Sequence, residues 1–257
     1  MDSLSRRVPP QAALILLAGA AGLIAMWGGL ARMGWVLPLA SGTLIGGHGP
    51  LMTGGFLGTV IAIERAVALR RGWAFLAPLL SGLGALLLAF GLGAPAGLPL
   101  SQAMITLGSL VLVLIFATFY RQHPTLISTL YAPALLAGSI CWLAGNALWL
   151  LRQPIYVAAH WWMAFLILTI VGERLELSRV VRLSVFSQRL LLAAVALYAF
   201  GLLATFANLD FGIRAAGLGE LALSVWLLRY DIARRTVRRT GLPRYIAACL
   251  LGGYLWL

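Results

Sequence analysis

A histidine stands inside a glycine-rich apolar stretch, GGHGPLMTGGFLGTVIAIER, which runs from Gly46 to Arg65. Neutral imidazole is a common ligand for haem iron and for copper. Polar groups are costly within an apolar segment, so His48 needs a physical reason to be there. Two interpretations stay open on the sequence: His48 ligates a metal or a haem, or it is hydrogen-bonded inside a helix bundle.

This stretch has a weaker copy later in the chain. GFLGTVIAIERAVAL (55–69) aligns with AFLILTIVGERLELS (164–178) at an offset of 109 residues, and each contains a Glu-Arg pair. The pairs are Glu64–Arg65 and Glu173–Arg174. We expect each pair to anchor its segment at the membrane interface, with the arginine reaching lipid phosphate and the carboxylate pairing with it. A proton-relay role for either glutamate is the alternative.

The Glu-Arg pairs allow the depth of two histidines to be compared. His48 precedes Glu64 by 16 residues and His160 precedes Glu173 by 13, which is roughly 24 and 20 Å of helix at 1.5 Å per residue. Both histidines are therefore expected in the outer third of a hydrocarbon core about 30 Å thick. Two histidines at similar depth on helices of one bundle suit axial ligation of a haem, or a copper site.

Other side chains join the candidate site on residue type. Met52 and Met163 lie about one helical turn below the two histidines and are candidate ligands, with core filling as the alternative role. Asn146 and Gln102 are expected to hydrogen-bond a neighbouring helix. Glu220 lies near the middle of an apolar segment and is costlier to bury, so both a structural and a functional role stay open for it.

The composition sets the class of protein that must position these residues. Of the 257 residues, 61% are hydrophobic and 10% are charged, and the mean hydropathy is +0.96. Soluble domains carry about 25% charged residues. The apolar runs are continuous and about 20 residues long, whereas a membrane β-barrel shows alternating segments of about 10. We therefore expect an all-α, polytopic transmembrane helix bundle.

Nine apolar segments are expected to be helical. They are 11–31, 37–64, 73–93, 99–120, 125–151, 154–174, 187–208, 211–229 and 242–257. The second is too long for one straight span and is expected to break near Gly46–Pro50, because glycine and proline favour irregular backbone. The ninth is short for a span, which suggests an incomplete helix of a longer chain with about twelve helices. The expected units are a first four-helix repeat (1–120), a second repeat (121–231), and a basic cytoplasmic loop followed by the start of that incomplete helix (232–257).

Arginine placement predicts the orientation. The net charge is +12 and all 19 basic residues are arginine. They lie at the ends of apolar runs, so we do not expect a nucleic-acid partner. With the N-terminus in the cytoplasm, sixteen arginines fall on the inner side and three on the outer side, as the positive-inside rule requires of a multi-pass inner-membrane protein. The basic run 229–244 is expected to be part of this signal, with a docking site for anionic lipid headgroups as the alternative.

Tryptophans cluster near the predicted outer ends of the spans. They are Trp35, Trp149, Trp161 and Trp162. We interpret them as an aromatic belt at the membrane–water interface.

The motif His48-Gly49-x-x-Met52, followed by Phe56, resembles the second-helix signature of haem–copper oxidase subunit I, in which the matching histidine ligates the low-spin haem. The segments 46–69 and 242–257, the latter ending in LGGYLWL, are more similar to the NnrS family. NnrS proteins are polytopic bacterial membrane proteins that contain haem and copper and are linked to nitric-oxide stress. The resemblance implies an inner-membrane protein that binds haem b or copper through His48 and has a respiratory partner. NnrS proteins usually have the histidine two residues before the methionine, whereas here the spacing is four.

Three functions remain open at this stage. The first is a haem- or metal-binding membrane protein related to respiration or nitric-oxide stress. The second is a transporter or permease for a small solute or protons, which the buried Glu220 would suit. The third is a non-catalytic membrane assembly subunit. The sequence leaves open whether the protein is an enzyme.

Overall fold

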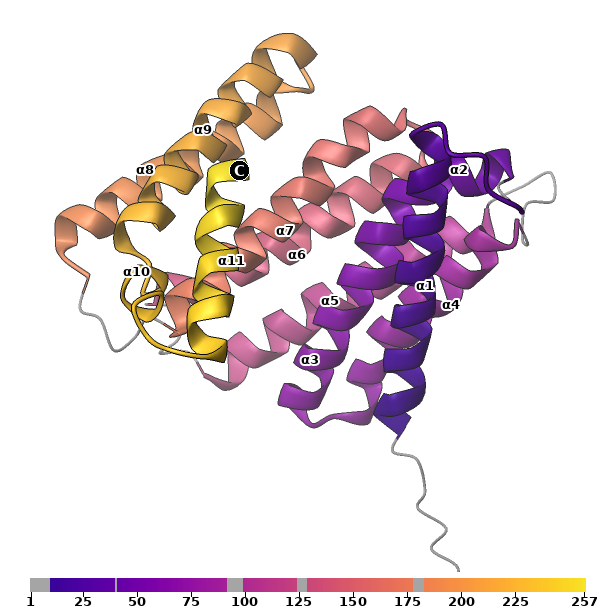
Figure 1. Ribbon diagram of the computed structural model, residues 1–257, viewed down its shortest axis with the longest axis horizontal. Coiled ribbons are helices and arrows are strands. Elements are labelled where there is room, and N and C mark those ends of the chain that lie inside the picture. The colour runs from indigo at the N-terminus through magenta and orange to yellow at the C-terminus, as the bar shows by residue number, and fades with distance from the viewer. Residues whose placement is uncertain (1–9, 40, 92–98, 124–128, 178–182) are drawn as a thin grey trace, which may run out of the picture. The chain divides into compact units, whose positions relative to one another are not determined.

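The computed structural model describes residues 10–39, 41–91, 99–123, 129–177 and 183–257. In these ranges the chain is helical and has no strand (Figure 1). Eight helices are long and apolar enough to cross a membrane. The predicted all-α transmembrane bundle is thereby confirmed as a fold class.

The helix bounds lie close to the predicted ones. The helices are α1 (Pro10–Arg32), α2 (Gly42–Pro50), η1 (Leu51–Gly58), α3 (Thr59–Leu69), η2 (Gly72–Phe75), α4 (Leu76–Ala89), α5 (Leu100–Gln122), α6 (Tyr131–Leu150), α7 (Ile155–Leu177), α8 (Val185–Ala204), α9 (Leu209–Tyr230), α10 (Ala233–Thr236) and α11 (Leu242–Trp256). The ninth predicted segment is α11, which has 15 residues and is not among the eight candidate spans.

The chain forms two compact units. The first comprises Met1–Pro124 and Leu136–Phe165, and the second comprises Thr125–Leu135 and Leu166–Leu257. The predicted four-helix repeats stay a prediction.

The predicted break near Gly46–Pro50 is wrong, because α2, η1 and α3 form one uninterrupted helical segment of 28 residues, Gly42–Leu69. The irregularity is a π-helical stretch, η1, which begins directly after Pro50. Proline has no N–H to donate to the preceding turn, and a wider helical turn accommodates that loss without ending the helix. Two threonine hydroxyls donate to backbone carbonyls of this segment: Thr53 Oγ1 to Gly49 O (2.9 Å) and Thr59 Oγ1 to Gly54 O (3.2 Å).

The first unit packs its helices through small residues. Ala21 and Ala25 of α1 meet Leu44, Leu51 and Ala85 in a fully buried cluster. Small side chains allow the helix backbones to approach closely, which is how helices associate inside a membrane. α1 therefore packs closely against the segment that carries His48.

The second unit is built on a hairpin of α8 and α9, which lie side by side (Figure 1). Glycines at the contact leave no room for a side chain: a Cβ on Gly201 would lie 2.1 Å from Ala216 N, and one on Gly219 would lie 2.5 Å from Tyr198 Cα. The indole of Trp226 in α9 also donates to Ser187 O in α8 at 2.8 Å. The two helices are therefore in backbone contact along their length.

Candidate functional site

His48 is held by α1. Its Nδ1 lies 2.7 Å from the carbonyl oxygen of Ala25. A carbonyl oxygen can only accept, so Nδ1 carries the hydrogen of this bond. In the neutral ring this leaves the Nε2 lone pair available to a ligand. Metal-ligating histidines are commonly oriented in this way, with the other ring nitrogen donating to a backbone carbonyl.

Glycines make room for the His48 ring. A Cβ on Gly29 of α1 would lie 2.7 Å from His48 Cε1, so only glycine at this position permits the contact. The following residue, Gly49, faces α7, where its Cβ position is 3.9 Å from the ring of Trp162. The ring is half-buried, and its position depends on the absence of a side chain at Gly29.

The remaining predicted ligands lie in different surroundings. His160 in α7 is half-buried. Met52 packs against the apolar cluster of α1, α2 and α4, which is the core-filling role. Met163 is 46% exposed on α7. Within the described ranges no three side chains of His, Cys, Asp or Glu are grouped to hold a metal ion, and pairing of His48 with His160 stays a prediction.

Asn146 forms the predicted hydrogen bond to a neighbouring helix. Its Oδ1 accepts from Trp162 Nε1 at 2.9 Å, and both side chains are buried. Trp162 also meets Trp149 edge to face, with ring centroids 5.8 Å apart. Interpreting Trp149, Trp161 and Trp162 as an aromatic belt is therefore wrong, because these indoles are buried. Trp35 is 61% exposed, as a belt residue would be.

The two Glu-Arg pairs differ in the partners of their arginines. Glu64 and Arg65 form an ion pair at 3.4 Å, with the glutamate exposed and the arginine mostly buried. The Arg65 guanidinium also lies 5.8 Å from the ring centroid of Phe116. Arg174, by contrast, is bonded to Asp231 of a distant segment, while Glu173 is half-buried beside it in α7.

Asp231 is the centre of a buried polar network in the second unit. It accepts two hydrogen bonds from Arg174, from Nε at 2.7 Å and from Nη2 at 2.8 Å, and one from Ala233 N at 3.1 Å. The Tyr254 hydroxyl donates to the same carboxylate, and Ser224 donates to the Tyr254 carbonyl. Burial raises the pKa of Asp231, but these hydrogen bonds and the Arg174 charge outweigh it and hold that pKa below its ordinary value.

Sequence reasoning missed Asp231 and Tyr254. The chain has seven acidic residues, and Asp231 stands within the basic run 229–244, which was interpreted through its arginines alone. The sequence did carry one signal for Asp231, which is the single carboxylate between the apolar segment 211–229 and the arginines that follow. Glu220, which sequence reasoning did single out, is half-buried in α9.

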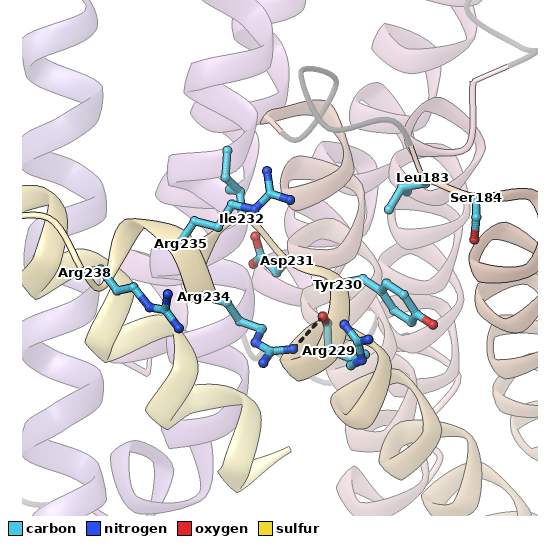
Figure 2. Close-up of a pocket in the computed structure, with 9 residues that line it drawn as sticks. All are labelled: Leu183, Ser184, Arg229, Tyr230, Asp231, Ile232, Arg234, Arg235 and Arg238. Carbon is cyan, nitrogen blue, oxygen red and sulfur yellow. Dashed lines mark hydrogen bonds between the residues drawn. The ribbon is translucent and has the colours of Figure 1, made fainter.

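An arginine-lined cavity lies next to this network (Figure 2). Its volume is about 490 Å³, and four arginines contribute to its wall. They are Arg229, Arg234, Arg235 and Arg238. Figure 2 shows Arg234 bonded through Nη1 to the Arg229 carbonyl at 3.0 Å. The Leu183–Ser184 segment lines the opposite wall.

A family model described as a domain of unknown function (DUF8744) matches residues 11–257. The chain belongs to this family. No curated protein and no solved structure matches the chain.

Proposed function

We propose that this multi-pass membrane protein binds a haem or a copper ion through His48, in a role related to respiration or nitric-oxide stress. One observation carries the proposal: Nδ1 of His48 is bonded to the Ala25 carbonyl at 2.7 Å, which orients the ring and leaves Nε2 to a ligand. The similarity of His48-Gly49-x-x-Met52 to haem-ligating second helices, and of 46–69 to NnrS proteins, points to the same chemistry.

The π-helical stretch that follows Pro50 supports this assignment. Such stretches occur frequently at functional sites, and this one begins three residues after His48. The residues fit one ligand to a haem or copper ion; His160 is our candidate for a second. When bound, the group would supply electron transfer or binding of a small gas molecule, and the chain would supply the ligand, its orientation and an apolar surrounding.

The test is an optical spectrum with metal analysis of the full chain purified in detergent. We expect a haem absorption band or bound copper in the wild type, and its loss in His48→Ala. His123→Ala is the matched control, because His123 is exposed at the end of α5 and should keep the wild-type signal. A folded wild-type protein that is colourless, metal-free and unable to take up added haem or copper would overturn the proposal.

A second candidate, transport of protons or of a small solute, draws on one observation. Glu220 is a half-buried carboxyl within a candidate span. Intramembrane carboxyls commonly mark proton and ion pathways. Flux into proteoliposomes that disappears in Glu220→Gln and persists in His48→Ala would favour this candidate over the first.

A further inference from the structure

In the part of the chain that the structure describes, the arginines around the cavity have no acidic partner of their own. Among the described residues, no carboxylate lies within ion-pair distance of Arg229, Arg234, Arg235 or Arg238. The carboxylate in the cavity wall belongs to Asp231, and it is engaged by Arg174 at 2.7 Å. The negative charge of Asp231 is thus balanced by Arg174, which does not line the cavity. The positive charges of the four arginines that do line the cavity are not balanced by Asp231.

An apolar groove meets the cavity at its wall. The groove has a volume of about 580 Å³ and runs between α8 and α9, where it is lined by Leu190, Leu197, Leu218 and Leu221 among other apolar side chains. Arg229 and Tyr230 line both the groove and the cavity. From Leu218 to Tyr230 the groove follows α9 for roughly 18 Å at 1.5 Å per residue. A charged cavity therefore lies at one end of an apolar channel on a candidate span.

We propose that the second unit binds an anionic phospholipid, with its phosphate at Arg229 and Arg234 and an acyl chain in the groove between α8 and α9. Guanidinium groups bind phosphate oxygens in paired hydrogen bonds. A soluble phosphate would satisfy the arginines but leave the groove without a role. A lipid satisfies both, because headgroup and acyl chain are joined in one molecule.

Topology alone does not account for this arrangement. The positive-inside rule asks only that arginines lie on the cytoplasmic side of the spans. It does not require that four of them line a cavity that shares wall residues with an apolar groove. Arg239 and Arg244 belong to the same basic run and do not line the cavity, so they provide a control with equal topogenic charge.

The test measures lipid retained by the full chain in detergent, by native mass spectrometry, with phosphatidylglycerol and phosphatidylcholine of the same acyl chains. We expect phosphatidylglycerol to be preferred by the wild type. The double variant Arg229→Gln/Arg234→Gln should bind it roughly 25-fold more weakly, because each arginine contributes a factor of about five at an anionic lipid. The double variant Arg239→Gln/Arg244→Gln should stay within a few-fold of the wild type.

A groove variant tests the acyl chain independently of charge. Ala193 is exposed and lines the groove, so Ala193→Trp should fill it and weaken lipid retention while every arginine remains. Equal losses in the two arginine doubles would overturn the proposal, because binding would then follow net charge. Inorganic phosphate that competes equally well in the wild type and in Ala193→Trp, with no preference for phosphatidylglycerol, would overturn the lipid assignment in favour of a soluble phosphate.

Discussion

At the scale of single residues, the stability of the second unit depends on the buried carboxylate of Asp231 and its ion pair with Arg174. Its side chain is 1% exposed and that of Arg174 is 14% exposed. Replacing Asp231 with asparagine removes the carboxylate that accepts two hydrogen bonds from the mostly buried Arg174 guanidinium. Breaking one half of a buried ion pair costs about 3–5 kcal/mol, so Asp231→Asn should lower the denaturation midpoint of the purified protein markedly.

An exposed pair of the same chemistry serves as the control. Arg214 Nε lies 2.9 Å from Asp210 Oδ2, but the side chains of Arg214 and Asp210 are 76% and 77% exposed. Water screens such a pair, so Asp210→Asn should leave the midpoint within error of the wild type. Equal losses in Asp231→Asn and Asp210→Asn would contradict the role assigned to the buried network.

The Asp231 network also predicts a pH dependence. The folded-state pKa of this carboxyl is held below its ordinary value, so its contribution to stability is present above the unfolded pKa and is lost as the pH falls through the folded one. The wild-type denaturation midpoint should therefore decrease on acidification below the ordinary aspartate range. Asp231→Asn should show a smaller decrease over the same interval, measured by circular dichroism.

The His48 ring gives a second prediction at this scale. A Cβ on Gly29 would lie 2.7 Å from His48 Cε1, whereas one on Gly19 in the same helix meets nothing within 4 Å. Gly29→Ala should displace the ring from the Ala25 carbonyl and lower the denaturation midpoint. Gly19→Ala should leave the midpoint unchanged or raise it slightly, because alanine favours a helix over glycine by up to about 1 kcal/mol in the free energy of unfolding. Similar midpoints in the two variants would show that the ring can move at no cost.

At the scale of helices, the α8–α9 hairpin depends on particular glycines. A Cβ on Gly219 would lie 2.5 Å from Tyr198 Cα, and one on Gly217 meets nothing within 4 Å. Gly219→Ala must push the backbones apart and should weaken the Trp226–Ser187 bond, with a loss of stability and a change in tryptophan fluorescence. Gly217→Ala, two residues earlier on α9, should change neither quantity. A fluorescence change in Gly217→Ala alone would contradict the packing described.

Sequence reasoning predicted the helices well, because an apolar run of about 20 residues has few other ways to satisfy its backbone in a membrane. It could not distinguish a break from a π-helical turn after Pro50, since the same glycines and proline permit both. The outcome depends on contacts such as Thr59 with Ser81, at 2.9 Å, which lie far apart in sequence. The Arg174–Asp231 bond spans 57 residues, and no local pattern indicates such a partner.

At the scale of the whole molecule, the order of spans makes a prediction about sidedness. Three candidate spans, α7, α8 and α9, lie between Gln153 and Thr240. An odd number of crossings places these two positions on opposite sides of the membrane, whichever way the chain is oriented. The arginine distribution predicts that the Thr240 side is cytoplasmic, because Arg234 to Arg244 flank it.

Single cysteines test this prediction, after Cys141 and Cys249 have been replaced. Gln153 and Thr240 are both exposed, so Gln153→Cys and Thr240→Cys should be reactive without disturbing a packed contact. In intact cells a membrane-impermeant maleimide should label Gln153→Cys, and Thr240→Cys should be labelled only after permeabilisation. Labelling of both from the same side would contradict three crossings between them. The reverse pattern would keep the crossings but invert the orientation, and would place the arginine cavity with its proposed lipid in the outer leaflet.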